Sequence, residues 1–154
     1  MDGLIGALVG AGVGAIAAWI FALDLRERDA KRAYASDLNA AAAAVIEGIG
    51  SHSAATQSFV FSIAGQAAAP PPHDSRARLV TAIRLGQMTA RGIDKLPFDA
   101  TFELITGQEA GTNSQIALRR ERAQKVLVGW RSGECDAQEA ARQISGGSAI
   151  EPIA

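Results

Sequence analysis

Hydrophobic residues are concentrated in one uninterrupted stretch close to the N-terminus. From Gly3 to Leu23 the sequence reads GLIGALVGAGVGAIAAWIFAL, with no charged residue between Asp2 and Asp24. As a helix this stretch measures about 31 Å, which matches the roughly 30 Å hydrocarbon core of a bilayer. Trp19 lies near its C-terminal end, where an indole ring suits the headgroup region. The pattern predicts that residues 1–23 form a transmembrane anchor.

Small residues recur at every fourth position of the predicted anchor. This spacing aligns them on one face of a helix, where the missing side chains allow the backbone of a second transmembrane helix to approach closely. We therefore expect a helix-packing interface, a glycine zipper, formed by Gly6, Gly10, Gly14, Ala18 and Ala22. Either a second copy of the chain or a different subunit would satisfy this interface.

Basic residues follow the predicted anchor, and none precedes it. Arg26, Arg28, Lys31 and Arg32 all lie within ten residues of its C-terminal end. The positive-inside rule then predicts a cytoplasmic location for residues 24–154 and an external N-terminus. In a bacterial cell this places the chain in the inner membrane, with Trp19 and these four cations at the membrane interface.

The first helix is expected to continue beyond the anchor to about residue 48. An apolar stripe with helical spacing follows the charged residues, and Gly48 and Gly50 are expected to end the helix. Two acid-before-base pairs at i,i+4, Asp24–Arg28 and Glu27–Lys31, favour helix before the stripe. The stripe consists of Tyr34, Leu38, Ala41, Val45 and Ile49.

Shorter helical segments follow, separated by glycine and proline. Residues 53–69 favour a helix, although their FVF motif would also suit a strand, and a break near residues 65–74 contains three consecutive prolines. The next helix is expected to begin at a cap, Asp74 or Ser75, and to continue to Gly92. Its inward-facing residues are expected to be Leu79, Val80, Ile83 and Met88.

The C-terminal third carries the clearest start signals. A short helix is expected from Pro97 to Ile105, Thr112 or Asn113 caps a fourth helix, and Asp136 caps a last one at residues 136–144. Residues 145–154 resemble a flexible tail. The residues expected to face inward are Phe98, Phe102, Ile116, Ala123, Val126, Leu127 and Trp130. The predicted fold is all-α, with one N-terminal transmembrane helix continuing into a small cytoplasmic helical bundle over residues 24–144.

Composition and charge narrow the functional classes. The 15 Lys and Arg residues nearly balance the 16 Asp and Glu residues, which argues against a nucleic-acid partner. A single cysteine, Cys135, excludes an internal disulfide framework and a cysteine-rich metal site. His52 and His73 have no ligand-spaced neighbours and are expected at the surface or in loops. No catalytic, cofactor, metal or small-molecule site is predicted.

Two basic clusters, in residues 75–95 and 119–131, are expected to be solvated helix faces. The second cluster contains Arg119, Arg120, Arg122, Lys125 and Arg131 around a single Glu121. Contact with anionic headgroups is one alternative for these cations, and contact with an acidic macromolecular partner is another.

The N-terminal glycines also fit a different fold. The sequence GAGVGA, residues 10–15, matches the G-x-G-x-x-G/A fingerprint and looks like the start of a Rossmann-type domain, with a strand over residues 4–9. No second strand ending in an acidic residue follows it. A cleaved signal peptide is a further alternative, although Met1–Gly3 lacks the usual basic region.

The layout resembles a set of bacterial and prophage-encoded single-pass proteins, in which a Gly/Ala-rich membrane helix continues into a charged helix of the type RERDAKRAYASDLNAA, here residues 26–41. The resemblance covers about the first 50 residues and implies membrane anchoring and a helical cytoplasmic part. The glycines are also similar to those of small phage holins, which oligomerise through membrane helices. We therefore expect a non-enzymatic accessory or scaffold subunit of a membrane complex, with a holin- or toxin-like oligomer as the alternative.

Overall fold

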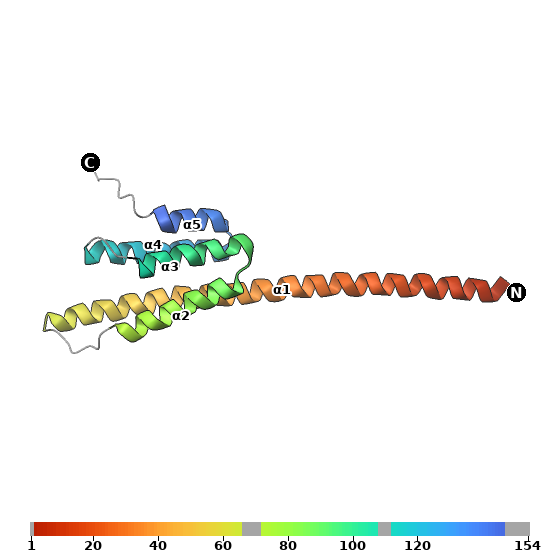
Figure 1. Ribbon diagram of the computed structural model, residues 1–154, viewed down its shortest axis with the longest axis horizontal. Helices are drawn as coiled ribbons and strands as arrows, with labels where there is room; N and C mark the ends of the chain where they lie inside the picture. The colour runs from red at the N-terminus through yellow and green to blue at the C-terminus, as the bar shows by residue number, and fades with distance from the viewer. Residues whose placement is uncertain (1, 66–71, 108–111, 147–154) are drawn as a thin grey trace. The chain divides into compact units, whose positions relative to one another are not determined.

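The computed structural model describes residues 2–65, 72–107 and 112–146, with side chains described at Trp19 and from Phe21 onward. Every regular element in this part of the chain is a helix, which confirms the all-α class (Figure 1). The chain divides into two compact units, residues 1–37 and 38–154. The first helix, α1, runs from Asp2 to Ile63 and contributes to both units.

The N-terminal unit consists of helix alone. All its described side chains are exposed except that of Tyr34, which is half-buried. Both expected ion pairs are formed, Asp24–Arg28 at 2.8 Å and Glu27–Lys31 at 2.7 Å. The hydrogen bond and the charge of Lys31 lower the pKa of Glu27, and those of Glu27 raise the pKa of Lys31. On an exposed helix each pair contributes only about 0.2–0.5 kcal/mol.

Helix α1 does not end at Gly48 or Gly50, so that prediction is wrong. A Cβ built on Gly48 would lie 3.0 Å from Leu79 Cδ1 and 3.4 Å from the Leu79 Cα. Gly48 therefore allows α2 to approach α1 closely, and it serves packing rather than termination. Residues 53–63, expected as a separate segment, are the last turns of the same helix.

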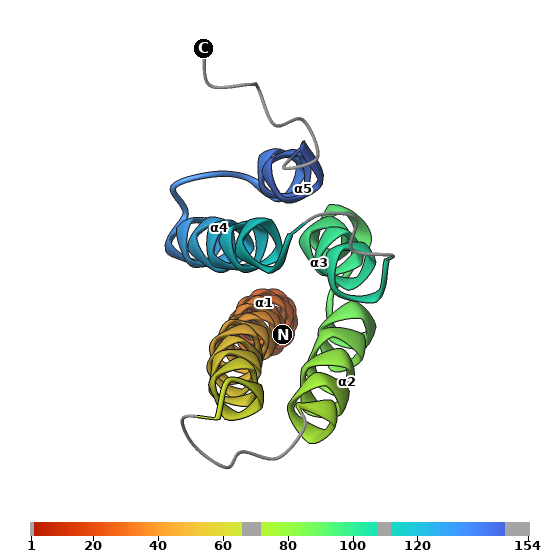
Figure 2. The ribbon, with the colours of Figure 1, turned by 90° about the vertical axis from the view of Figure 1, so that its left-hand side faces the viewer.

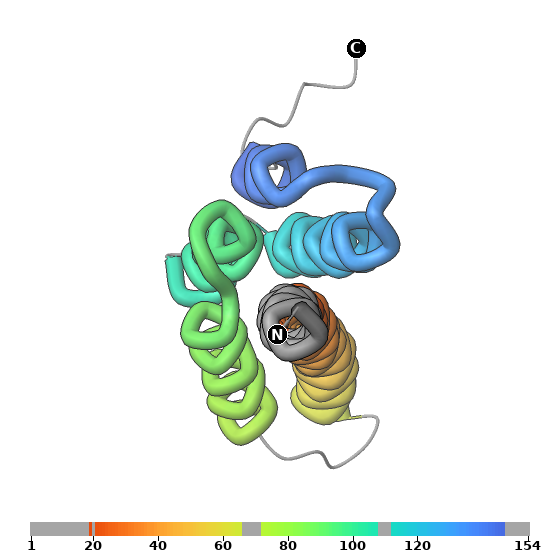
Figure 3. Tube along the Cα trace, turned by 90° about the vertical axis from the view of Figure 1, so that its right-hand side faces the viewer, coloured from red at the N-terminus to blue at the C-terminus, as the bar shows by residue number. Residues whose placement is uncertain are grey.

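In its described residues the second unit is a bundle of five α-helical segments in three layers (Figures 1 and 2). The first layer consists of residues 38–63 of α1 and of α2, His73–Thr89. The middle layer consists of α3, Leu96–Thr106, and α4, Asn113–Ser132. The third layer is α5, Ala137–Ser145, which covers the middle layer. A short 3₁₀ helix, η1, Gly92–Lys95, leads from α2 into α3. The view from the opposite end shows the same order of layers (Figure 3).

The core takes large apolar side chains from all five α-helices. Phe98 is fully buried, and its ring meets the edge of Trp130 at a centroid distance of 5.5 Å and an interplanar angle of 83°. This T-shaped pair is worth about 0.5–1.5 kcal/mol beyond its buried area. The other large buried side chains are Val45, Ile49, Leu79, Ile83, Ile105, Leu127 and Ile144.

The predicted starts of α4 and α5 are confirmed. Thr112 is the N-cap of α4 and forms a complete capping box with Gln115. Asp136 is the N-cap of α5, and its carboxylate accepts a hydrogen bond of 2.8 Å from the Glu139 amide. Such caps are worth about 1 kcal/mol each.

Helix α2 differs from its prediction at both ends. Its N-cap position is Pro72, without a side-chain cap, and the Ser75 hydroxyl inside the first turn donates to the Pro72 carbonyl over 2.8 Å. Met88 is 82% exposed, whereas Ile83 is buried. Five residues correspond to about 140° around a helix, so Met88 lies far from the buried face, which Gly86 occupies instead.

Within the described residues, no helix is both long enough and apolar enough to cross a membrane. Most of the predicted anchor, including Gly6, Gly10, Gly14 and Ala18 of the glycine zipper, lies outside the residues whose side chains are described. The backbone over residues 4–9 is helical, and the described residues contain no strand. The Rossmann alternative required a strand there and is therefore wrong.

Candidate functional site

The sequence-predicted interface residues that the structure describes are all on the surface of α1. Trp19 is 65% exposed, and Ala22 is also exposed. The four cations Arg26, Arg28, Lys31 and Arg32 are likewise exposed. Phe21, which like Trp19 lies near the C-terminal end of the predicted anchor, is 75% exposed. The apolar side chains of Trp19, Phe21, Leu23 and Leu25 are therefore not buried against any described residue of their unit.

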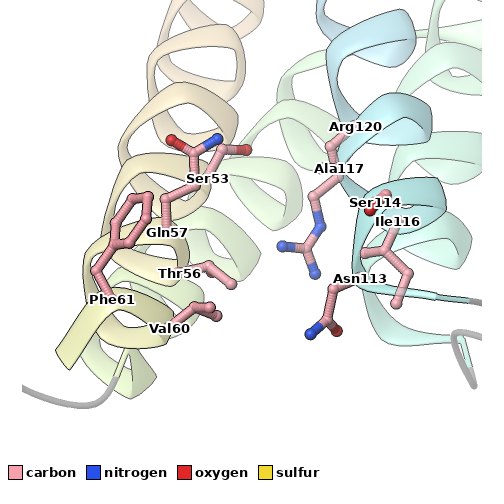
Figure 4. Close-up of a pocket in the computed structure, with 10 residues that line it drawn as sticks. All are labelled: Ser53, Thr56, Gln57, Val60, Phe61, Asn113, Ser114, Ile116, Ala117 and Arg120. Carbon is pink, nitrogen blue, oxygen red and sulfur yellow. The ribbon is translucent and has the colours of Figure 1, made fainter. Parts of the chain in front are cut away.

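The second unit contains a cavity of about 260 Å³ between α1 and α4 (Figure 4). Two contacts show that these helices are antiparallel. Gln124 Nε2, later in α4, donates to the Ile46 carbonyl, earlier in α1, over 3.3 Å. The cavity, by contrast, lies between the last turns of α1 and the first turns of α4. The wall from α1 consists of Ser53, Thr56, Gln57, Val60 and Phe61. The wall from α4 consists of Asn113, Ser114, Ile116, Ala117 and Arg120.

The α1 wall combines apolar and polar groups at helical spacing. Val60 and Phe61 are both exposed at the end of the helix. The Thr56 hydroxyl donates to the His52 carbonyl over 2.8 Å, so its hydrogen is directed along its own helix. The chain forms this wall because α1 continues past Gly48 and Gly50.

The α4 wall begins at the capping box. The Gln115 amide donates to Thr112 Oγ1 over 3.4 Å, and the Thr112 amide donates to Gln115 Oε1 over 3.0 Å. The amides of Asn113 and Ser114 belong to the same first turn, where no preceding helical carbonyl can accept their hydrogens. This end of α4 therefore presents N–H groups and the positive end of the helix dipole.

Among the described residues that line this cavity, Arg120 is the one cation. Its side chain is on the inner side of α4 and extends toward α1 (Figure 4), and the residue is only 8% exposed. It also has interactions within the protein. A guanidinium stays charged at every physiological pH and carries five N–H donors, so it can serve more than one acceptor.

The expectation that Arg120 belongs to a solvated basic face is wrong, because Arg120 is buried. Ile116, Ala123 and Leu127 form an inward-facing stripe on α4, and position 120 fills the gap in their spacing of four, three and four residues. This stripe was the available signal. The identity of the residue, an arginine among other basic residues, concealed it.

His52 is buried, which corrects its expected surface position. It lies at the α1–α2 contact, with Nδ1 3.0 Å from Ser75 Oγ. The Ser75 hydroxyl also donates to the Pro72 carbonyl, so Ser75 links the start of α2 to His52 of α1. The contact of His52 with Ser75 therefore helps to position α2 against α1. His73, by contrast, is exposed.

Cys135 is not activated as a nucleophile. Burial raises the pKa of its thiol, and the carboxylates of Asp136, Glu139 and Glu134 raise it further. A raised pKa lowers the thiolate fraction at neutral pH, and the thiolate is the reactive form. Among the residues that the structure describes, no three His, Cys, Asp or Glu side chains are grouped so that they could hold a metal ion.

Comparison of the chain with protein-family models, with curated proteins and with solved structures finds no match.

Proposed function

We propose that this chain is a single-pass protein of the bacterial inner membrane and a non-enzymatic accessory or scaffold subunit of a membrane complex. The observation that carries the proposal is the exposure of large apolar side chains at the start of the described part of α1. Trp19 and Phe21 lie within the uncharged stretch 3–23, Leu25 lies just after it, and each of the three is more than 60% exposed.

The free energy of transfer from water favours an apolar environment around these side chains. Transfer of a Leu- or Phe-sized side chain out of water is worth about 1.5–3 kcal/mol when burial is complete. Trp19, Phe21 and Leu25 are exposed, so no described residue of the N-terminal unit provides this energy for them. A bilayer would accept the uncharged segment, and Trp19 would lie at the headgroup level.

The orientation follows from the flanking charges. Arg26, Arg28, Lys31 and Arg32 are exposed and available to the cytoplasmic leaflet, and no Lys or Arg precedes the segment. In this proposal the N-terminus is outside and the helical bundle is cytoplasmic. The bundle follows the anchor without an intervening loop, since both belong to α1.

The membrane segment would also provide the contact with the complex. Gly6, Gly10 and Gly14, followed by Ala18 and Ala22, would let a second transmembrane helix pack closely, whether from another subunit or from a second copy. A homomeric assembly would support the holin- or toxin-like alternative, and a heteromeric one the accessory role.

Insertion is tested by carbonate extraction of membranes that contain the full chain. We expect the full chain to stay in the membrane pellet, because residues 3–23 would be embedded. A matched chain that starts at Asp24 should be released into the supernatant or aggregate. Protease added to inside-out vesicles should then digest residues 24–154. Full chain recovered in the supernatant without detergent would refute the proposal, and a protected bundle would refute its orientation.

The glycine zipper is tested by Gly10→Ile with Val9→Ile as the matched control. Gly10 is the central glycine, so a β-branched side chain there would separate the two helices, whereas Val9 points about 100° away. We expect Gly10→Ile to weaken assembly by at least about 1 kcal/mol, on the scale of overpacking a tight contact. The measurement is recovery of the complex in mild detergent at equal expression, with the partners identified by mass spectrometry. Equal recovery of both variants would mean that the glycines form no interface.

A further inference from the structure

We propose that the α1–α4 cavity binds a small anionic amphiphile, in which a carboxylate or phosphate head is attached to a short aliphatic chain. The proposal is independent of the membrane assignment, because every residue that lines the cavity belongs to the second unit. It rests on three features of the cavity: a buried cation, the first turn of a helix and an apolar wall.

The buried cation and the helix start favour an anionic head. Arg120 lies on the cavity wall at 8% exposure, so a ligand anion would meet its charge out of bulk water. Hydrogen bonds between a guanidinium and a carboxylate or phosphate are roughly twice as strong as neutral ones. Asn113 and Ser114 line the same cavity at the start of α4, where amides and helix dipole also favour an anion.

The remaining wall favours an aliphatic tail. Val60 and Phe61 of α1 line the cavity together with Ile116 and Ala117 of α4. Val60 and Phe61 are exposed, so a tail that covers them would remove apolar surface from water at about 25 cal/mol per Å². Apolar walls with a few placed polar groups are typical of small-molecule sites.

The size of the cavity limits the ligand to a small one. At about 30 Å³ per water molecule, 260 Å³ corresponds to the space of about nine waters. A six-carbon carboxylate has a comparable number of non-hydrogen atoms. The cavity is therefore better suited to a short amphiphile than to an acidic peptide, which would also need several cations along the groove.

Binding is tested on the full chain in nanodiscs of zwitterionic lipid, with labelled Ile and Val methyl groups observed by NMR. The probes are hexanoate, hexyl phosphate, 1-hexanol and acetate. We expect saturable shifts of the Val60 and Ile116 methyl signals with the two six-carbon anions. Because 1-hexanol lacks the charge and acetate lacks the tail, each should bind at least tenfold more weakly than hexanoate.

Two variants and a control locate the site. Arg120→Gln should remove the preference for hexanoate over 1-hexanol. Ala117→Leu fills the cavity while keeping Arg120, so it should abolish binding of both probes even if Arg120→Gln fails to fold. Ala77→Leu makes the same change at an exposed position on α2, outside the cavity, and should bind hexanoate as the wild type does.

Several results would overturn the proposal. Equal affinity for 1-hexanol and hexanoate would show that no anion is recognised. Unchanged binding by Ala117→Leu would place the probes elsewhere on the protein. Shifts produced by an acidic peptide but not by hexanoate would assign the cavity to a protein partner. If the full chain does not enter the nanodiscs, the same titration is made on the full chain in buffer without lipid, so failed insertion and failed binding are separate results.

Discussion

Gly86 gives the most direct test of the packing in the bundle. It is buried on α2, facing α3, and a Cβ at this position would lie 2.4 Å from Phe98 Cε1 and 2.5 Å from Phe98 Cδ1. Phe98 has no room to move away, because it is fully buried and its ring packs edge-on against Trp130. Gly86→Ala must therefore separate α2 from α3 or displace the aromatic pair.

The expected cost follows from two opposing terms. Replacing a helical glycine by alanine gains about 1 kcal/mol of helix propensity. Overpacking a tight core costs about 1–3 kcal/mol. The separation of 2.4 Å is far shorter than the roughly 3.5–4.0 Å optimum for two carbon atoms. We therefore expect a packing cost for Gly86→Ala at the upper end of that range. We expect a net destabilisation of about 2 kcal/mol, the difference between about 3 and about 1.

Gly50→Ala is the matched control on α1. A Cβ on Gly50 would lie 3.4 Å from Gln124 Nε2, the far end of a flexible side chain. The same gain in helix propensity should then appear with little packing cost, so we expect a stabilisation of up to about 1 kcal/mol. The two glycine-to-alanine changes should thus move stability in opposite directions.

The assay is urea unfolding of the full chain in mild detergent, followed by tryptophan fluorescence. Trp19→Phe in all variants makes Trp130 the only tryptophan, so the signal reports the core beside Phe98. The unfolding midpoint should fall for Gly86→Ala and rise for Gly50→Ala at unchanged slope. A midpoint for Gly86→Ala at or above that of the parent protein would refute the close approach of α2 and α3.

Two further predictions concern the helix start of α4 and the thiol. Thr112→Ala removes the capping box and should destabilise the bundle by about 1 kcal/mol in the same urea assay. Thr112→Asn should retain most of that stability, because asparagine is also a good N-cap residue. Equal losses of stability in the two variants would contradict a capping role. Cys135 should react with iodoacetamide at pH 8 more slowly than a small free thiol, because its raised pKa leaves less thiolate. Asp136→Asn keeps the cap but removes a carboxylate that raises the pKa, so the reaction should accelerate; an unchanged rate would contradict that electrostatic effect.

Local signals in the sequence were sufficient for the C-terminal helices. Thr112 and Asp136 cap the helices predicted for them, and Pro97 lies in the first turn of α3. Each of these signals acts through hydrogen bonds or steric limits within one turn. The prediction therefore needs no knowledge of which helices meet.

Signals that depend on tertiary contacts were misread. Gly48 looked like a helix end because its conformational freedom is visible in the sequence, whereas its close contact with Leu79 of α2 is not. Ser75 looked like a cap, but its hydroxyl and His52 join two helices. The cavity could not be predicted, because the sequence shows neither that α1 continues to Ile63 nor that its last turns face α4.

The antiparallel contact of α1 with α4 has a consequence for the folding of the nascent chain. Gln124 and the Ile46 carbonyl that it contacts are 78 residues apart in the sequence. At translation rates of about 5–20 residues per second, the first partner leaves the ribosome roughly 4–16 s before the second. During that interval the apolar stripe of α1, which includes Val45 and Ile49, has been synthesised without the α4 side chains that complete its core. The order of synthesis thus creates a period in which this stripe is open to chaperones or to misassociation with other nascent chains.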